Sequence, residues 1–197
     1  MSATKSNKLA AVPLPVILQR CAFPPETLEA IAGLASVEAV VGKLAAAGQG
    51  MEAARVLAHA LPKREAVWWA CMCAIHTADA KVTETDRKTR ELAESWVRQP
   101  TAELARTAME EAKRSGFQSP EAWTGVAAFW SGDSLTPPNT PAVAPPPHLT
   151  GVAVAGAVAL ASVRNDAARQ KQRLALFLRS AQDIAAGGSG RLAPEAA

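Results

Sequence analysis

One stretch of the sequence, residues 66–75, is apolar or cysteine at every position, and it constrains the fold more than any other feature. It lies within LPKREAVWWACMCAIH, which begins at Leu61 and ends at His76. A helix that is apolar on every side is stable in water only when other elements surround it. The stretch therefore predicts a helix at the centre of a compact protein, with Trp68 and Trp69 largely buried.

Helix start and stop signals divide most of the chain into short helices. Ser36, Thr83 and Ser119 each precede a helical pattern, as N-cap residues do, and Gly48 and Gly132 follow one. The apolar content of 49% is mostly alanine, leucine and valine, which favours closely packed helices. We therefore expect an all-α fold, a compact bundle of about eight or nine short antiparallel helices joined by short connections. Helices are expected within residues 23–34, 36–48, 49–61, 62–76, 83–99, 101–116, 119–132, 149–163 and 165–187.

The last two predicted helices carry further signals. Thr150 is the expected N-cap of the first of them, and Asn165 or Asp166 that of the second. Gly151 and Gly156 lie among alanines, which predicts a close contact between helices. The side chains expected to form the structural core are Trp68, Trp69, Cys73, Trp96, Trp123, Phe129 and Trp130.

The predicted organisation is a single helical domain with two tails. Residues 1–22 are expected to form an N-terminal tail that docks through its apolar end, residues 23–187 the domain, and residues 188–197 a disordered C-terminus. Within the domain, residues 132–148 hold six of the fourteen prolines and must be extended.

The proline-rich stretch has two interpretations. A flexible linker would separate the last two helices from the body. A strap would cross the body with Leu135, Val143 and Leu149 in grooves. The apolar side chains and the scarcity of serine and glycine favour the strap.

The cysteines and the histidine of the central helix are the strongest candidates for chemistry. Cys71 and Cys73 are two positions apart, so on a helix they diverge by about 200° and cannot grip one metal ion. Cys73 and His76 share a face, but two ligands do not make a metal site. We expect structural roles, no cofactor, no metal and no enzymatic activity; an enzyme or a redox or metal sensor using Cys71, Cys73 or His76 is the alternative.

Charge and hydropathy narrow the remaining classes. The 21 basic and 18 acidic residues give a net charge of +3. This balance of charges is too even for a typical nucleic-acid binder, which places a nucleic-acid-binding regulator second among the alternatives. No apolar run approaches the ~20 residues of a membrane-spanning helix, and three cysteines favour a reducing compartment, so a cytoplasmic location without membrane insertion is expected. Glu110, Glu111, Asp79 and Asp86 are expected to be surface acids. The candidate partner surface consists of arginines on predicted outer helix faces, namely Arg87, Arg90, Arg164, Arg169 and Arg173.

Two motifs carry a resemblance. The Trp-Trp-Ala-Cys stretch and the Phe-Trp-Ser-Gly stretch with its proline-rich continuation resemble a bacterial family of helical proteins of unknown function. The resemblance spans about Arg55 to Gly187, and some members lie among genes for contractile, type VI-like secretion machinery. It offers no catalytic residues. It implies a non-catalytic adaptor, scaffold or chaperone-like accessory protein that acts through protein–protein contacts, with secretion components as partners.

Overall fold

The structure, a computed structural model, describes residues 8–195 and confirms the predicted all-α bundle. Within this range there are ten α-helices, two 3-10 helices and no strand. The α-helices are α1 (Leu14–Cys21), α2 (Pro25–Ala30), α3 (Val37–Ala46), α4 (Gly50–Ala60), α5 (Lys63–His76), α6 (Glu84–Arg98), α7 (Ala102–Arg114), α8 (Pro120–Ser131), α9 (Leu149–Val163) and α10 (Gln170–Ala185). The 3-10 helices are η1 (Lys8–Ala10) and η2 (Ala167–Arg169).

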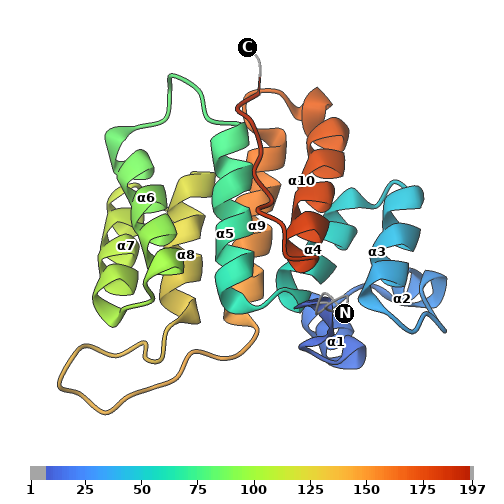
Figure 1. The fold of residues 1–197 in the computed structure, drawn as a ribbon, viewed down its shortest axis with the longest axis horizontal. Coiled ribbons are helices and arrows are strands. Elements are labelled where there is room, and N and C mark those ends of the chain that lie inside the picture. Colours follow the sequence, from blue (N-terminus) through green and yellow to red (C-terminus); the bar gives the residue numbers. More distant parts are fainter. Residues whose placement is uncertain (1–7, 196–197) are drawn as a thin grey trace, which may run out of the picture.

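Helices α5 and α9 pack against each other in the middle of the bundle (Figure 1). Helices α6, α7 and α8 pack on one side of this pair, and α4 and α10 on the other, with α3 against α4. Nine of the fourteen residues of α5 are buried, as expected for a helix without a polar face.

The N-caps predicted at three helices are confirmed. The hydroxyl oxygens of Ser36, Thr83 and Ser119 accept hydrogen bonds from backbone N–H groups three residues later, at 3.2, 3.1 and 3.0 Å. The cap predicted at Thr150 is wrong: His148 stands at the N-cap position, two residues earlier, and the Thr150 hydroxyl donates to the Trp130 carbonyl oxygen instead. Asp166 caps the short η2 that precedes α10.

Glycines allow close helix contacts, as predicted. A Cβ at Gly156 of α9 would lie 3.4 Å from the Trp123 ring, and a Cβ at Gly151 would overlap the His59 imidazole. Gly125, which the sequence analysis did not single out, brings α8 just as close to α6 and α7: a Cβ there would lie 2.6 Å from the Thr89 methyl group.

The prediction that residues 1–22 form a tail is corrected for the part that the structure describes. Residues 14–21 form α1, which packs against α4 and buries Ile17 and Cys21. The apolar end therefore docks as predicted, but as a helix. Residues 1–7 of the predicted tail lie outside the described residues.

The predicted core divides into two groups. Trp69, Cys73 and Trp96 are buried, as expected. Trp68, Trp123, Phe129 and Trp130 are of intermediate burial and pack against the edge of the core, so Trp69 is fully buried whereas Trp68 lies at the core's edge. The indole N–H groups of Trp68 and Trp123 donate to the carbonyl oxygens of Ser189 and Phe117, because a tryptophan at the edge of a core uses its polar atom on the segment that covers it.

Candidate functional site

The two cysteines of α5 are fully buried. Burial raises the pKa of the Cys71 and Cys73 thiols well above their usual range, and raises that of Cys21 to about 12. A thiolate, the form that reacts and binds metals, is therefore disfavoured at all three positions. Within residues 8–195, no three His, Cys, Asp or Glu side chains gather as a metal site would need.

His76 contacts the C-terminal end of the chain. Its Nδ1 atom lies 2.5 Å from the Ala193 carbonyl oxygen, and its ring meets the Phe177 ring edge-on. The Nε2 atom is buried without a hydrogen-bond partner. His76 therefore holds another part of the chain and shares no site with Cys73.

His59 of α4 is the second buried histidine. Its ring lies against the α9 backbone at Gly151, and its Nδ1 atom has no hydrogen-bond partner. Burial, together with the positive charges of Arg20 and Arg55 and neighbouring His148, lowers the pKa of His59 to about 4. The imidazole is therefore neutral in the folded protein over the physiological pH range.

Three of the five arginines of the candidate partner surface are not on the surface, which corrects the prediction for them. The side chains of Arg87 and Arg169 are 49% and 42% exposed, but those of Arg90, Arg164 and Arg173 are largely buried. Each buried arginine has a carboxylate partner: Arg90 pairs with Glu94, Arg164 with Glu121 and Arg173 with Glu195. Glu94 lies one turn along the same helix as Arg90, whereas Glu121 and Glu195 come from other segments, which spacing along one helix does not reveal.

Two of the four predicted surface acids are buried as well. Glu111 pairs with Lys88 at 2.7 Å and Arg114 at 2.6 Å, and hydrogen bonding from Lys88 is the main cause that lowers its pKa. Asp86 accepts hydrogen bonds from the hydroxyls of Thr83 and Ser119. These acids join helices α6, α7 and α8, which is a structural role.

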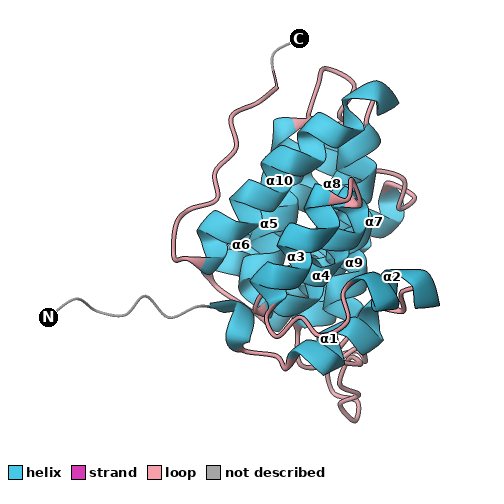
Figure 2. Ribbon diagram, turned by 90° about the vertical axis from the view of Figure 1, so that its right-hand side faces the viewer, coloured by secondary structure: helices cyan, strands magenta, loops and turns pink. Residues whose placement is uncertain are grey.

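The predicted disorder at 188–197 is corrected for residues 188–195, which we call the C-terminal segment. It leaves α10 and runs back along α5 and α10 (Figures 1 and 2). Side chains of the body hold its backbone carbonyl oxygens: Trp68 donates to that of Ser189 at 2.7 Å, and Ser180 to that of Gly190 at 2.5 Å. The His76 contact with Ala193 continues the series. Three segment N–H groups donate to the body: Gly188 to the Asp183 carbonyl oxygen at 2.7 Å, Gly190 to Asp183 Oδ2 at 2.8 Å, and Glu195 to the His76 carbonyl oxygen at 2.7 Å.

An ion pair fixes the far end of the C-terminal segment. The guanidinium of Arg173 donates to both carboxylate oxygens of Glu195, with the shortest contact at 2.6 Å, and Arg169 pairs with the same carboxylate at 3.3 Å. Hydrogen bonding from Arg173 is the main cause that lowers the pKa of Glu195. The Arg173 side chain is only 4% exposed, so this is a charge buried in the body and neutralised by the segment.

Two glycines fit the segment to the body. A Cβ at Gly188 would overlap the Asp183 carboxylate, and a Cβ at Gly190 would overlap Ile184. Gly190 also has a φ of +60°, which side chains with a Cβ rarely adopt. Both glycines of the predicted disordered end are therefore required for this close approach.

The proline-rich stretch fits neither interpretation. Residues 132–148 form a loop that projects from the ends of α8 and α9 (Figure 1). Val143, which a strap would bury, is 51% exposed. A separating linker is equally wrong, because α9 packs directly against α8, α5 and α4.

The proline-rich loop is held by bonds within itself. The Leu135 N–H donates to the Val143 carbonyl oxygen at 2.8 Å, the Val143 N–H donates to Ser134 Oγ at 3.2 Å, and the Thr136 hydroxyl donates to the Pro141 carbonyl oxygen at 2.8 Å. Residues 137–144 are all exposed. The loop therefore presents an ordered, exposed turn.

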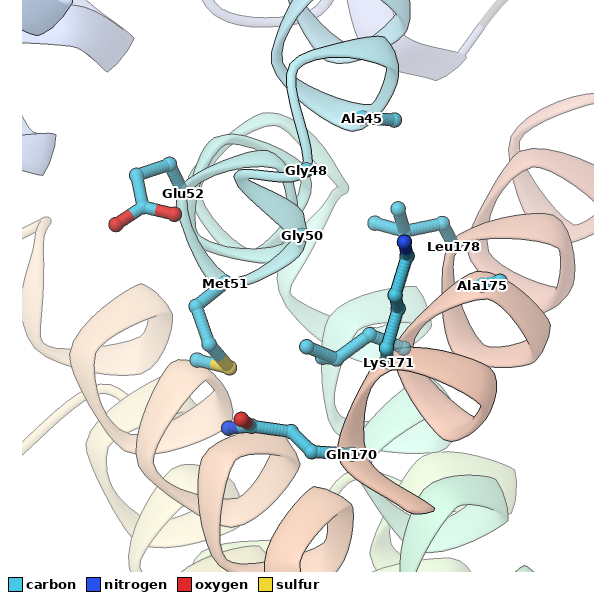
Figure 3. A pocket seen from close by; sticks show the side chains of 10 residues that line it. Ala45, Gly48, Gly50, Met51, Glu52, Gln170, Lys171, Ala175 and Leu178 are labelled. Carbon is cyan, nitrogen blue, oxygen red and sulfur yellow. The ribbon is translucent and has the colours of Figure 1, made fainter. Parts of the chain in front are cut away.

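A hollow of about 380 Å³ lies between α4 and α10 (Figure 3). Leu174, Leu178 and Ala45 give it an apolar wall, and Lys171 and Gln170 stand at its edge. Glu52 points away from Lys171, so the hollow presents no paired acid and base. Nothing in its lining identifies a ligand.

The chain was compared with known proteins. Residues 40–185 match the sequence model of a family described as "Family of unknown function (DUF6931)". The chain belongs to this family. The matched range begins within α3 and ends at the last residue of α10, so it contains most of the bundle. No curated protein and no solved structure matches the chain. None of the helices in residues 8–195 is long and apolar enough to cross a membrane.

Proposed function

We propose that this protein is a non-catalytic, cytoplasmic adaptor of the DUF6931 family that binds a protein partner through its proline-rich loop. The observation that carries the proposal is the exposed turn at residues 137–144. Proline restricts the free loop to few conformations, so less entropy is lost when a partner binds it. Exposed prolines are also recognised by aromatic grooves in proteins that bind extended segments.

The chemistry of the loop supports one kind of partner. Pro138 and Pro141 flank Asn139, whose φ of +66° makes this part of the loop a tight turn with its two prolines exposed. Val143 adds an exposed apolar side chain beside them. Residues 137–144 contain no charged group, so a partner groove lined by aromatic and apolar side chains fits best.

The resemblance to proteins encoded near type VI-like secretion genes suggests where the partner should be sought. A secretion-system component that carries such a groove is the candidate. The buried, protonated thiols of α5 give no support to the enzyme or sensor alternative.

The test is capture of partners by the tagged, full-length protein in its host, followed by mass spectrometry. Val143→Asp places a charge on the exposed turn, while Val152→Asp does the same on α9, where the valine is 41% exposed. A partner that binds the loop is recovered with wild type and with Val152→Asp, and falls at least about tenfold with Val143→Asp, since a buried unpaired charge costs more than 1.4 kcal/mol. Equal recovery of every captured protein with all three forms would contradict the role of the loop.

A further inference from the structure

The groove between α5 and α10 recognises the main chain of the segment that lies in it. Trp68, Ser180 and His76 contact three successive stretches of backbone through carbonyl oxygens, and the Glu195 N–H donates back to α5. Contacts of this kind bind another chain whose backbone follows the same path, provided that glycine stands where Gly188 and Gly190 leave no room for a Cβ. Of the segment's side chains, Leu192 packs against the core and Glu195 enters an ion pair.

The arginine at the end of the groove requires an anion. Arg173 Nη1 donates to the carbonyl oxygens of Ser162, Arg164 and Asp166, near the C-terminal end of α9. These bonds fix the guanidinium in place but leave its charge unneutralised, and Glu195 supplies the carboxylate. A glutamate or aspartate of another chain has the same chemistry.

The other end of the groove carries mixed charge. A hollow of about 470 Å³ lies beside Trp68 and Ser189, lined by the cations Lys8, Arg64 and Arg98, by Glu65 and by Arg191 of the segment itself. The preference of the groove for an acidic residue therefore rests on Arg173, and hydrogen-bonding side chains cross the rest of it. Its helices, α5 and α10, fall within the family match at residues 40–185, whereas the segment that fills it does not.

We propose that the groove between α5 and α10 is a peptide-binding site, occupied in cis by the C-terminal segment, and that its partner is an extended segment of another protein that displaces it and supplies one acidic residue to Arg173. The partner segment carries a glycine, an apolar residue two positions later and an acidic residue three positions after that, as Gly190, Leu192 and Glu195 do. The tethered segment competes at a high effective concentration, so it lowers the apparent affinity for any partner. This site is separate from the proline-rich loop, so it goes beyond the adaptor proposal and fails or holds independently of it.

The test uses a fluorescent peptide of residues 187–197 and full-length protein, with binding measured by anisotropy. Gly190→Val forces a φ of +60° on a β-branched residue and overlaps Ile184, so it releases the segment. The peptide should bind Gly190→Val roughly 10- to 100-fold more tightly than wild type, because the competitor in cis is gone.

Two controls define the site. Arg191→Ala changes an exposed side chain of the segment and should leave binding as weak as in wild type. A peptide with lysine in place of Glu195 should bind neither form, because it meets Arg173 with a like charge. Absence of binding to a folded Gly190→Val protein, or equal binding to wild type and this variant, would overturn the proposal.

A second measurement needs no variant, and it decides the case if Gly190→Val does not fold. Hydrogen exchange of ¹⁵N-labelled wild type is followed with and without excess unlabelled peptide. Displacement should speed the exchange of the Gly190 and Glu195 amides severalfold and leave the amides of α5 unchanged. Exchange that does not respond to the peptide would show that the segment is a fixed part of the fold.

Discussion

The proline-rich loop and the C-terminal segment are both extended, and they behave in opposite ways. The loop is apolar and conformationally restricted, yet it projects from the bundle with Val143 exposed. The C-terminal segment begins Gly-Ser-Gly at positions 188–190, yet it lies against α5 and α10 and is hydrogen-bonded along its length. Apolar composition therefore does not decide which extended segment packs on this body.

Backbone hydrogen bonding accounts for the difference. A proline has no N–H group, so the loop has few donors to offer the body, and the N–H groups of Leu135 and Val143 bond within the loop. The C-terminal segment keeps its N–H groups, and its glycines allow the backbone to approach α10 closely. The body offers donors along this path, at Trp68, Ser180 and Arg173.

The largest expected effect is the difference in stability loss between a tryptophan of the core and one that contacts the C-terminal segment. Trp69 is fully buried and donates to the Phe177 carbonyl oxygen, so Trp69→Ala should lower the free energy of unfolding by about 3–5 kcal/mol. Trp68→Ala removes a partly buried ring and one hydrogen bond to the segment, and should cost only about 1–2 kcal/mol. Denaturant unfolding measures both. Equal losses would mean that Trp68 belongs to the core as much as Trp69 does.

The second effect concerns the arginine that links α9 to the segment. Arg173→Met leaves Glu195 with only its pair to Arg169 and removes one donor from each of three carbonyl oxygens, and should lower the free energy of unfolding by about 2–4 kcal/mol. Arg169→Met is the matched control, because its half-exposed side chain contributes less than about 1 kcal/mol. If the two substitutions cost the same, the buried ion pair does not hold the segment.

The third effect is a dependence of segment docking on pH. The pKa of Glu195 is lower in the folded protein than its usual value, so the ion pair stabilises docking above that usual value and is lost as the pH falls through the depressed pKa. The indole N–H resonance of Trp68 reports release of the segment. Glu195→Gln should abolish this dependence and weaken docking at neutral pH.

The indole resonance of Trp69 is the internal control for that titration. The pKa of His59 is about 4 in the folded protein, so the unfolded state binds more protons between its ordinary value near 6.5 and about 4. The whole fold therefore loses stability as the pH falls through this range. A Trp68 resonance that changes only together with that of Trp69 would show that the segment does not detach on its own.

The smallest effect is expected in the proline-rich loop. Replacing residues 135–147 with a Gly/Ser sequence of equal length should change the free energy of unfolding by less than about 1 kcal/mol, because the loop buries little surface and its length is unchanged. Thermal unfolding measures the change. A loss larger than that of Trp68→Ala would restore the strap interpretation and remove the contrast between the two segments.

Local signals were sufficient to predict the bundle. The all-apolar stretch at residues 66–75 predicts a helix in a central position. The caps at Ser36, Thr83 and Ser119 could be predicted because the capping residue and the N–H group that it binds lie within one helical turn. The glycines of α9 predicted a close helix contact, but not its partners, His59 of α4 and Trp123 of α8.

Long-range partners could not be predicted. Arg164 meets Glu121 from 43 residues away, and Arg173 meets Glu195 from a segment that composition alone marks as disordered. The contacts of Trp68 and His76 with the C-terminal segment span more than a hundred residues. Such pairings depend on how the helices pack, and no pattern within one helix encodes them.

Hydrogen exchange of the free wild-type protein tests the central contrast most directly. The amides of Gly190 and Glu195 should be protected well above those of Asn139 and Ala144 in the loop, because only the former donate to the body. Both sets should exchange faster than the amides of α5 at the centre of the bundle. If the segment amides exchange as fast as the loop amides, the C-terminal segment is not held in the groove, and the account given for α5 and α10 is wrong.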